Sequence, residues 1–344
     1  MACAPCLDTA MSTRERRPTR AGFAPLWLAA AGLAAAGCDD LRECDPPDPE
    51  RQTELPAALS QTGLYADIAS GTVASDVVAY APGFELWSDG AEKHRFIRLP
   101  KGAQIDTSAQ DAWQFPDGTR LWKEFRRDGV LVETRLLAKV GPAPEDWAAV
   151  AYVWNADGTD ALATPGGAED ARGTPHDVPA AAECMGCHGG TESRVLGFSA
   201  IQLAASPGAV DLDEIAARGM LSHPPRRPIR LPGDAVAQAA LGWLHANCSH
   251  CHNRTRPSSD GARCYDPQRR FDFTLRVDEI ASVESTATYR TAVGTVIRPG
   301  DPDDSDAVER ARRRDPDWPS MPPLGTEIVD QDGLAALRAW IRRL

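Results

Sequence analysis

The sequence predicts a multidomain protein in which a β-rich N-terminal domain, a sandwich or open barrel, precedes a mainly α-helical C-terminal region. Its 344 residues are enough for two or three domains. Short segments in which apolar and charged residues alternate lie between 94 and 155, which is typical of strands. After residue 233, apolar residues recur every three or four positions, which is typical of helices. A stretch rich in Gly, Pro and Ala begins at 166 and separates the two patterns.

The β-rich domain is expected over residues 61–165. Candidate strands are 94–100, 119–127, 131–140 and 148–155, and the turn sequences "FPDGT", "RDGV" and "NADGT" lie between them. Tryptophans recur here, and we expect them in the core rather than in a ligand platform: Trp87, Trp113, Trp122, Trp147 and Trp154.

Three helices are expected in the C-terminal region. Residues 233–248 place Ala237, Leu241 and Leu244 on one stripe, with Asp234 as N-cap. Residues 329–344 form one apolar face, and 305–314 place acids first and arginines last, which suits the helix dipole.

The N-terminus has the pattern of an export signal. Arginines between 11 and 20 precede an apolar run that ends at Cys38. Small residues before this cysteine are typical of a lipoprotein-type signal peptide over 1–37, although Ala35 stands where leucine is usual. Ordinary signal-peptidase cleavage is the alternative. Residues 38–60 read as an acidic, Pro-rich tether, so we expect a periplasmic protein anchored to a membrane by a lipid on Cys38.

Two Cys-x-x-Cys-His motifs carry the chemistry. The first is Cys184, Cys187 and His188, and the second is Cys248, Cys251 and His252. Two thiols at this spacing can form thioethers with the vinyl groups of one haem, and the following histidine can ligate its iron. The sequence therefore predicts two covalently attached haem c groups. A zinc site and disulfides are the alternatives for each cysteine pair.

A sixth iron ligand is suggested for the second haem. Met321 stands in the Pro-rich segment "SMPPLGT", 69 residues after His252, and its alternative role is core packing. For the first haem the candidates are Met220, His223 and His94, with His176 as a further one. If none of these ligates, the first iron is open to a small molecule.

These motifs and their surroundings resemble known haem proteins. Residues 233–344, with a helix, the second motif, "MPPLG" and a final helix with "LRAWI", resemble a class I cytochrome c domain. The wider segment 61–344, with "LWSDGAEKHRFIRLP", "CMGCHG" and "ALGWLHANCSHCHN", resembles an uncharacterised family of exported bacterial dihaem proteins. The resemblance implies a cytochrome c-like domain over 233–344, after a linker region with the first motif over 166–232. It implies thioether anchors at Cys248 and Cys251, with His252 and Met321 as axial ligands.

The sequence departs from this pattern after the second motif. A long charged insert there carries Cys264, which either pairs with Cys44 as a disulfide or remains a free thiol.

Three functions fit these observations. The net charge of −12 argues against nucleic acid as a partner, because phosphate binding needs a basic surface. Single-electron transfer between a donor and an acceptor redox protein is the leading hypothesis. The alternatives are a peroxidase-like haem oxidoreductase with an open first haem, and a binding module in the β-rich domain with an appended haem relay.

Overall fold

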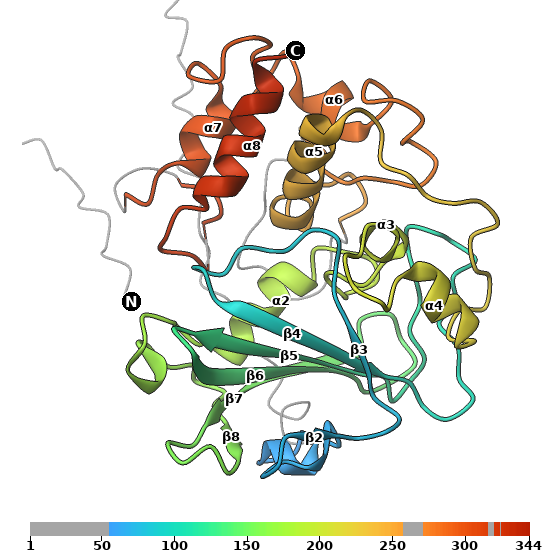
Figure 1. Ribbon diagram of the computed structural model, residues 1–344, viewed down its shortest axis with the longest axis vertical. Coiled ribbons are helices and arrows are strands. Elements are labelled where there is room, and N and C mark those ends of the chain that lie inside the picture. The colour runs from blue at the N-terminus through green and yellow to red at the C-terminus, as the bar shows by residue number, and fades with distance from the viewer. Residues whose placement is uncertain (1–54, 257–270, 316–319, 324) are drawn as a thin grey trace, which may run out of the picture. The chain divides into compact units, whose positions relative to one another are not determined.

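An antiparallel sheet of six strands, paired in sequential order, forms the centre of the structure (Figure 1). The computed structural model describes residues 55–256, 271–315, 320–323 and 325–344. The strands are β3 (Val78–Tyr80), β4 (Glu92–Arg98), β5 (Arg120–Arg127), β6 (Val130–Lys139), β7 (Trp147–Trp154) and β8 (Ala161–Ala163). A separate hairpin comprises β1 (Tyr65–Asp67) and β2 (Thr72–Val73) and follows the short 3-10 helix η1 (Leu59–Gln61).

Both faces of this sheet are buried. Trp122, Leu136 and Tyr152 project to one face and pack with Leu59 and Leu64 from the segment around η1. Neighbouring positions project to the other face, where a second cluster contains Ile97, Leu121, Leu137, Trp113 and Phe198. The alternation explains why the strands could be recognised from their sequence. Trp113, Trp122, Trp147 and Trp154 are buried, as expected of core residues. Trp87, expected there too, is only half-buried, and its Nε1 donates to the carbonyl of Ile328.

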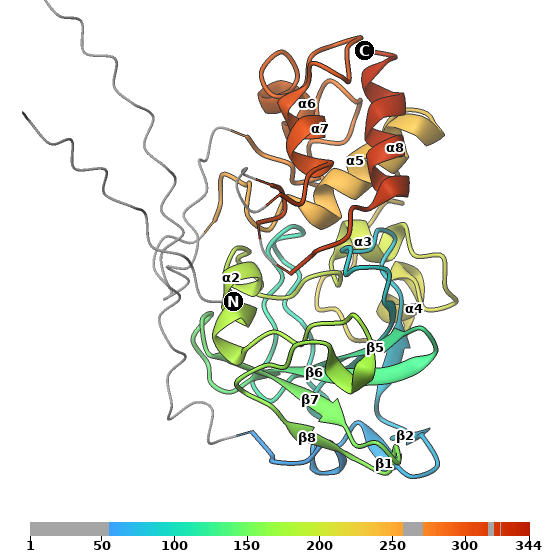
Figure 2. The same ribbon diagram turned by 90° about the vertical axis from the view of Figure 1, so that its left-hand side faces the viewer.

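Short helices cover the second face. They are η2 (Ala171–Gly173), α2 (Ala181–His188), α3 (Ala200–Ala204) and α4 (Leu212–Ala217). The helices α2, α3 and α4 lie on the same side of the sheet (Figures 1 and 2). Side chains of Ser199 and Asp211 accept hydrogen bonds at the first turns of α3 and α4, which satisfies amide groups that a short helix leaves without partners.

Four helices follow in the C-terminal part: α5 (Ala235–Asn247), α6 (Ala287–Ala292), α7 (Asp306–Ala311) and α8 (Gln331–Ile341). The side chain of Asp234 accepts hydrogen bonds from the amides of Val236 and Ala237, so the expected N-cap of α5 is confirmed. Helices α5 and α8 pack together through Leu241 and Leu337 in a third cluster. None of the described helices is long and apolar enough to cross a membrane.

The predicted fold class is wrong. The seven α-helices of the described residues are short, and helix accounts for 23% of these residues. A mainly α-helical, cytochrome c-like C-terminal region does not fit this content. The expected helical stripes did mark α5, α7 and α8, but the connecting segments run in loops and single turns. The β-rich part is one open sheet rather than a sandwich or barrel, because helices and loops, not a second sheet, cover its second face.

The predicted domain boundaries stay predictions. The described residues belong to one compact unit, and hydrogen bonds join the loop between β3 and β4 to helix α5. Asn247 at the end of α5 accepts a bond from the amide of Trp87 and donates one to the carbonyl of Glu85. The segment between β3 and β4 therefore holds the end of α5, which is where the second Cys-x-x-Cys-His motif begins.

Candidate functional site: two adjoining Cys-x-x-Cys-His motifs

Helix α2 carries the first motif. Cys184 and Cys187 are half-buried free thiols one turn apart, and His188 is the last residue of the helix. Burial raises the pKa of Cys184 to about 11, so the thiol is held protonated at neutral pH. Their spacing of i, i+3 and i+4 places the two thiols and the imidazole on one face of this short helix.

The imidazole of His188 is oriented by the loop that follows α2. Its Nδ1 lies 2.7 Å from the carbonyl oxygen of Arg194 and donates to it, which leaves Nε2 as the unprotonated nitrogen of the neutral ring. Arg194 adopts a left-handed backbone conformation with φ 61°, and its guanidinium donates to the carbonyls of Gly189 and Thr191. Burial, and then the charge of Lys123, lowers the pKa of His188 to about 4, so the ring is neutral, as a metal ligand requires.

The second motif follows the end of α5 in a tight turn. The amides of Cys251 and His252 both donate to the carbonyl of Cys248, at 3.2 and 2.8 Å. The ring of His252 lies against two phenylalanines, with centroid distances of 6.2 Å to Phe271 and 5.8 Å to Phe273. The amide of Phe273 also donates to the carbonyl of His252 at 3.0 Å. This histidine therefore lies at an apolar wall.

The two motifs touch each other. Gly190, two residues after His188, packs so closely on the second motif that a Cβ atom there would lie 1.7 Å from the carbonyl oxygen of His250. The buried amide of Asn253 donates to the carbonyls of Gly190 and Ser249, at 2.9 and 2.7 Å. Arg256 donates to the carbonyl of His250 at 2.9 Å. Segments some 60 residues apart in the sequence thus form one site.

The donor set of each motif fits a covalently bound haem. Two thiols and one imidazole on a short segment match the needs of two thioethers and one axial bond, and His188 keeps its Nε2 for that bond because its Nδ1 is engaged. Among the described residues no group of three or more His, Cys, Asp and Glu side chains could hold a metal ion. The described cysteines are all free thiols.

Met321 lies in the loop before α8, and its amide donates to the carbonyl of Arg310 near the end of α7 at 3.0 Å. Asp89 fixes the same loop a few residues later, since its carboxylate accepts from the amides of Glu327 and Ile328 and from the hydroxyl of Thr326. Ligation of the second haem by Met321 stays a prediction.

The candidates for the sixth ligand of the first haem are dispersed. His94 projects from β4 with a side chain 59% exposed and pairs with Glu124, on the sheet face away from α2. Met220 is buried in the apolar cluster on the α2 side. His223 is exposed and bonds to Ser222. His176 is buried and its Nε2 lies 2.7 Å from Glu133. The structure brings none of these four side chains into a described contact with His188.

Several residues of the site were missed by the sequence analysis. His250 was treated as a spacer within the second motif, yet it is buried, and burial and then His188 lower its pKa to about 3. Asn253 directly follows the motif and links it to the first. Lys123 lies on the buried face of β5, between Leu121 and Phe125. A charged residue at a position where the alternation predicts an apolar one could have identified it from the sequence. The residues Cys38, Cys44 and Cys264 lie outside the described residues, so lipidation and the Cys44–Cys264 disulfide stay predictions.

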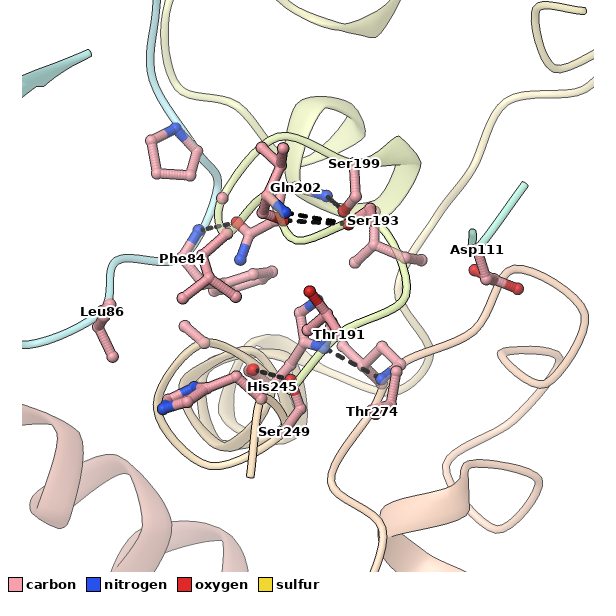
Figure 3. Close-up of a pocket in the computed structure, with 18 of the residues that line it drawn as sticks. Phe84, Leu86, Asp111, Thr191, Ser193, Ser199, Gln202, His245, Ser249 and Thr274 are labelled. Atoms are coloured by element: carbon pink, nitrogen blue, oxygen red, sulfur yellow. Dashed lines mark hydrogen bonds between the residues drawn. The ribbon is translucent and has the colours of Figure 1, made fainter. Parts of the chain in front are cut away.

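A cavity of about 110 Å³ adjoins the second motif and the loop that follows the first. Figure 3 shows Thr191, from the loop after the first motif, facing His245 of α5 and Ser249 of the second motif. Lys123 and Arg95 of the sheet also line this cavity. The cavity therefore lies where the sheet, the loop after α2 and the end of α5 meet.

Comparisons with protein-family models, with curated proteins and with solved structures found no match for this chain.

Proposed function

We propose that the protein is an exported dihaem c-type cytochrome that transfers single electrons between a donor and an acceptor redox protein. The observation that carries the proposal is the packing of Gly190, just after the first Cys-x-x-Cys-His motif, against His250 of the second and its hydrogen bond with Asn253. Two one-electron groups attached at adjoining motifs suit the relay of electrons within one compact unit. The proposed periplasmic location and lipid anchor at Cys38 rest on the sequence alone.

Each motif has a defined task in this proposal. Haem, when bound, supplies a reversible one-electron change at iron. Cys184 and Cys187 would hold one group and Cys248 and Cys251 the other. His188 and His252 would each provide an imidazole nitrogen to iron. The carbonyl of Arg194 fixes the ring of His188, and Phe271 and Phe273 exclude water from one side of His252.

Haem stoichiometry tests the proposal. The protein would be expressed with the cytochrome c maturation machinery, and its haem content measured by the reduced pyridine-haemochrome spectrum and by intact mass. We expect two covalent haems in the wild type and one in each double variant, Cys184→Ala/Cys187→Ala and Cys248→Ala/Cys251→Ala. A wild-type chain without covalent haem would exclude a cytochrome and favour zinc or a disulfide at each cysteine pair.

A haem oxidoreductase with an open first iron is a second candidate. It is favoured by the surroundings of the candidate ligands. His94 lies on the sheet face away from α2, His223 is exposed, Nε2 of His176 is engaged by Glu133, and Met220 is packed in an apolar cluster. Carbon monoxide added to the reduced wild type would distinguish the two functions. Binding at one haem supports the oxidoreductase, and no binding supports electron transfer with both irons six-coordinate. If His250→Ala then binds carbon monoxide at one haem, the buried His250 is the ligand that closes that iron.

A further inference from the structure

Three cations stand side by side on the sheet face beneath α2. In the register of the sheet, Arg95 of β4 is directly opposite Lys123 of β5, and Lys123 is directly opposite Arg135 of β6. Like charges at directly opposite positions of a sheet repel each other. Arg95 is only 4% exposed, so water screens little of this repulsion. Such a row needs negative charge close by.

The carboxylates in this region neutralise only part of that charge. Glu85 pairs with Arg95 and with Lys93, and Glu133 pairs with Arg135. Lys123, in the middle of the row, has no carboxylate partner among the described residues. Four cations of these strands therefore share two carboxylates. Burial and then the neighbouring cations lower the pKa of Lys123 to about 7, so an anion beside this amine would favour its charged form.

The row lies beneath α2, which carries the first motif. Met185, between the two cysteines, packs against the cluster on this sheet face that contains Leu121 and Leu137, the neighbours of Lys123 and Arg135 along their strands. Lys123 and Arg95 also line the cavity that adjoins the loop after the motif. Two buried polar atoms on its wall, Oγ1 of Thr191 and Nδ1 of His250, have no hydrogen-bond partner among the described residues. Asp111 and Glu192 line the same cavity, but neither carboxylate pairs with Lys123 among the described contacts. Lys123 and the two unpaired polar atoms therefore lack a partner there.

We propose that Arg95, Lys123 and Arg135 form an anion-binding site that holds the propionate groups of the haem attached at Cys184 and Cys187. The inference rests on the proposed function. A haem carries two propionates, which can supply the negative partner that Lys123 lacks among the described residues. Arg95 and Arg135 keep their own carboxylates, and Lys123 is the cation without one. Lys123 is thus the principal partner of the propionates and a positioning residue for the first haem.

A redox titration of the haem-loaded protein tests this assignment. The variants are Lys123→Met, which removes the charge, and Lys123→Arg, which keeps it. The control is Lys101→Met, which removes an exposed lysine in the turn after β4. Haem content is measured first on every sample. We expect two haems throughout, and a lower midpoint potential for one haem in Lys123→Met alone, because loss of a nearby positive charge disfavours the arrival of an electron. Lys123→Arg should restore the wild-type potential.

Each contrary result has a separate meaning. A wild type without covalent haem rejects the proposed function itself. Two haems with the same pair of potentials in the wild type and in Lys123→Met reject only the propionate site. Inorganic phosphate, added to the haem-loaded wild type, tests for a free anion at the same cations. If phosphate shifts one haem potential in the wild type and not in Lys123→Met, the cations bind an external anion, and the assignment to propionates is overturned.

Discussion

The backbone of Gly190 lies against the carbonyl group of His250, so close that any side chain at position 190 would overlap it. This contact joins the segment after the first motif to the interior of the second. The conformation of Gly190 is not the reason that glycine is required, because its φ is outside the left-handed region. The requirement is space, and it arises only because the two motifs pack together.

Gly190→Ala should therefore destabilise the protein. The added methyl group overlaps the carbonyl of His250 and the guanidinium of Arg256, and overpacking of a tight contact costs about 1–3 kcal/mol. The free energy of unfolding from urea titration measures the effect. Gly166→Ala is the matched control, because no atom lies within 4 Å of a Cβ at that position. Equal stability of the two variants would show that the motifs do not pack as described.

Asn253→Ala should also weaken the contact between the motifs. The buried side chain donates to the carbonyls of Gly190 and Ser249, and removal of the amide leaves both acceptors without their partner. A buried polar group left unpaired costs about 1–3 kcal/mol. Hydrogen exchange would locate the loss: the amides of the loop after α2 and of the turn after α5 should both exchange faster. Faster exchange in the second motif alone would contradict a shared contact.

The sequence predicted correctly those features that depend on the residues of a single strand or helix. Alternation in "RLWKEFRR" identified β5, and Asp234 before an apolar stripe identified the start of α5. The two Cys-x-x-Cys-His motifs were visible because haem attachment depends on neighbouring residues. The helix content of the C-terminal region was overestimated. The apolar stripes identified three helices, but they carry no information about the loops between them.

What the sequence could not give is the meeting of distant segments. The contact of Gly190 with His250 depends on how the loop after α2 packs on the end of α5, and no local pattern encodes it. The row of Arg95, Lys123 and Arg135 depends on strand register. Register is set by turns and by the buried faces of the sheet, so each cation alone reads as an ordinary charged residue of a strand.

Glu133→Gln should lower stability at neutral pH. The carboxylate is fully buried and bonds to Arg135 and to His176. Loss of its charge leaves Arg135 without its counter-ion. Breaking a fully buried pair costs about 3–5 kcal/mol, and we expect a smaller loss here because the Arg135 side chain is 31% exposed. Thermal unfolding at pH 7 would measure the loss. Glu92→Gln is the control, because Glu92 is an exposed residue of β4.

The same variant should change how stability depends on pH. Burial alone would raise the pKa of Glu133, but Arg135 and His176 outweigh it and the pKa is lowered from 4.5. A carboxyl group with a lowered pKa stabilises the fold above its unfolded pKa, and this stabilisation is lost as pH falls below that value. The difference between wild type and Glu133→Gln should thus shrink below about pH 4.5. A difference that stays constant to lower pH would show that Glu133 does not titrate as its contacts imply.

Asp89 should control the loop that contains Met321. Its carboxylate accepts hydrogen bonds from Thr326, Glu327 and Ile328, and it stands in a left-handed conformation with φ 51°. Asp89→Gly keeps this conformation without strain and removes every side-chain acceptor. We expect a loss of about 1–2 kcal/mol in the free energy of unfolding. We also expect a lower midpoint potential for one haem, because methionine ligation raises the potential and the loosened loop holds Met321 less firmly. Asp89→Asn, which tolerates the same conformation and keeps one acceptor oxygen, is the matched control. If Asp89→Gly loses stability while both potentials stay unchanged, Met321 is not the axial ligand of the second haem.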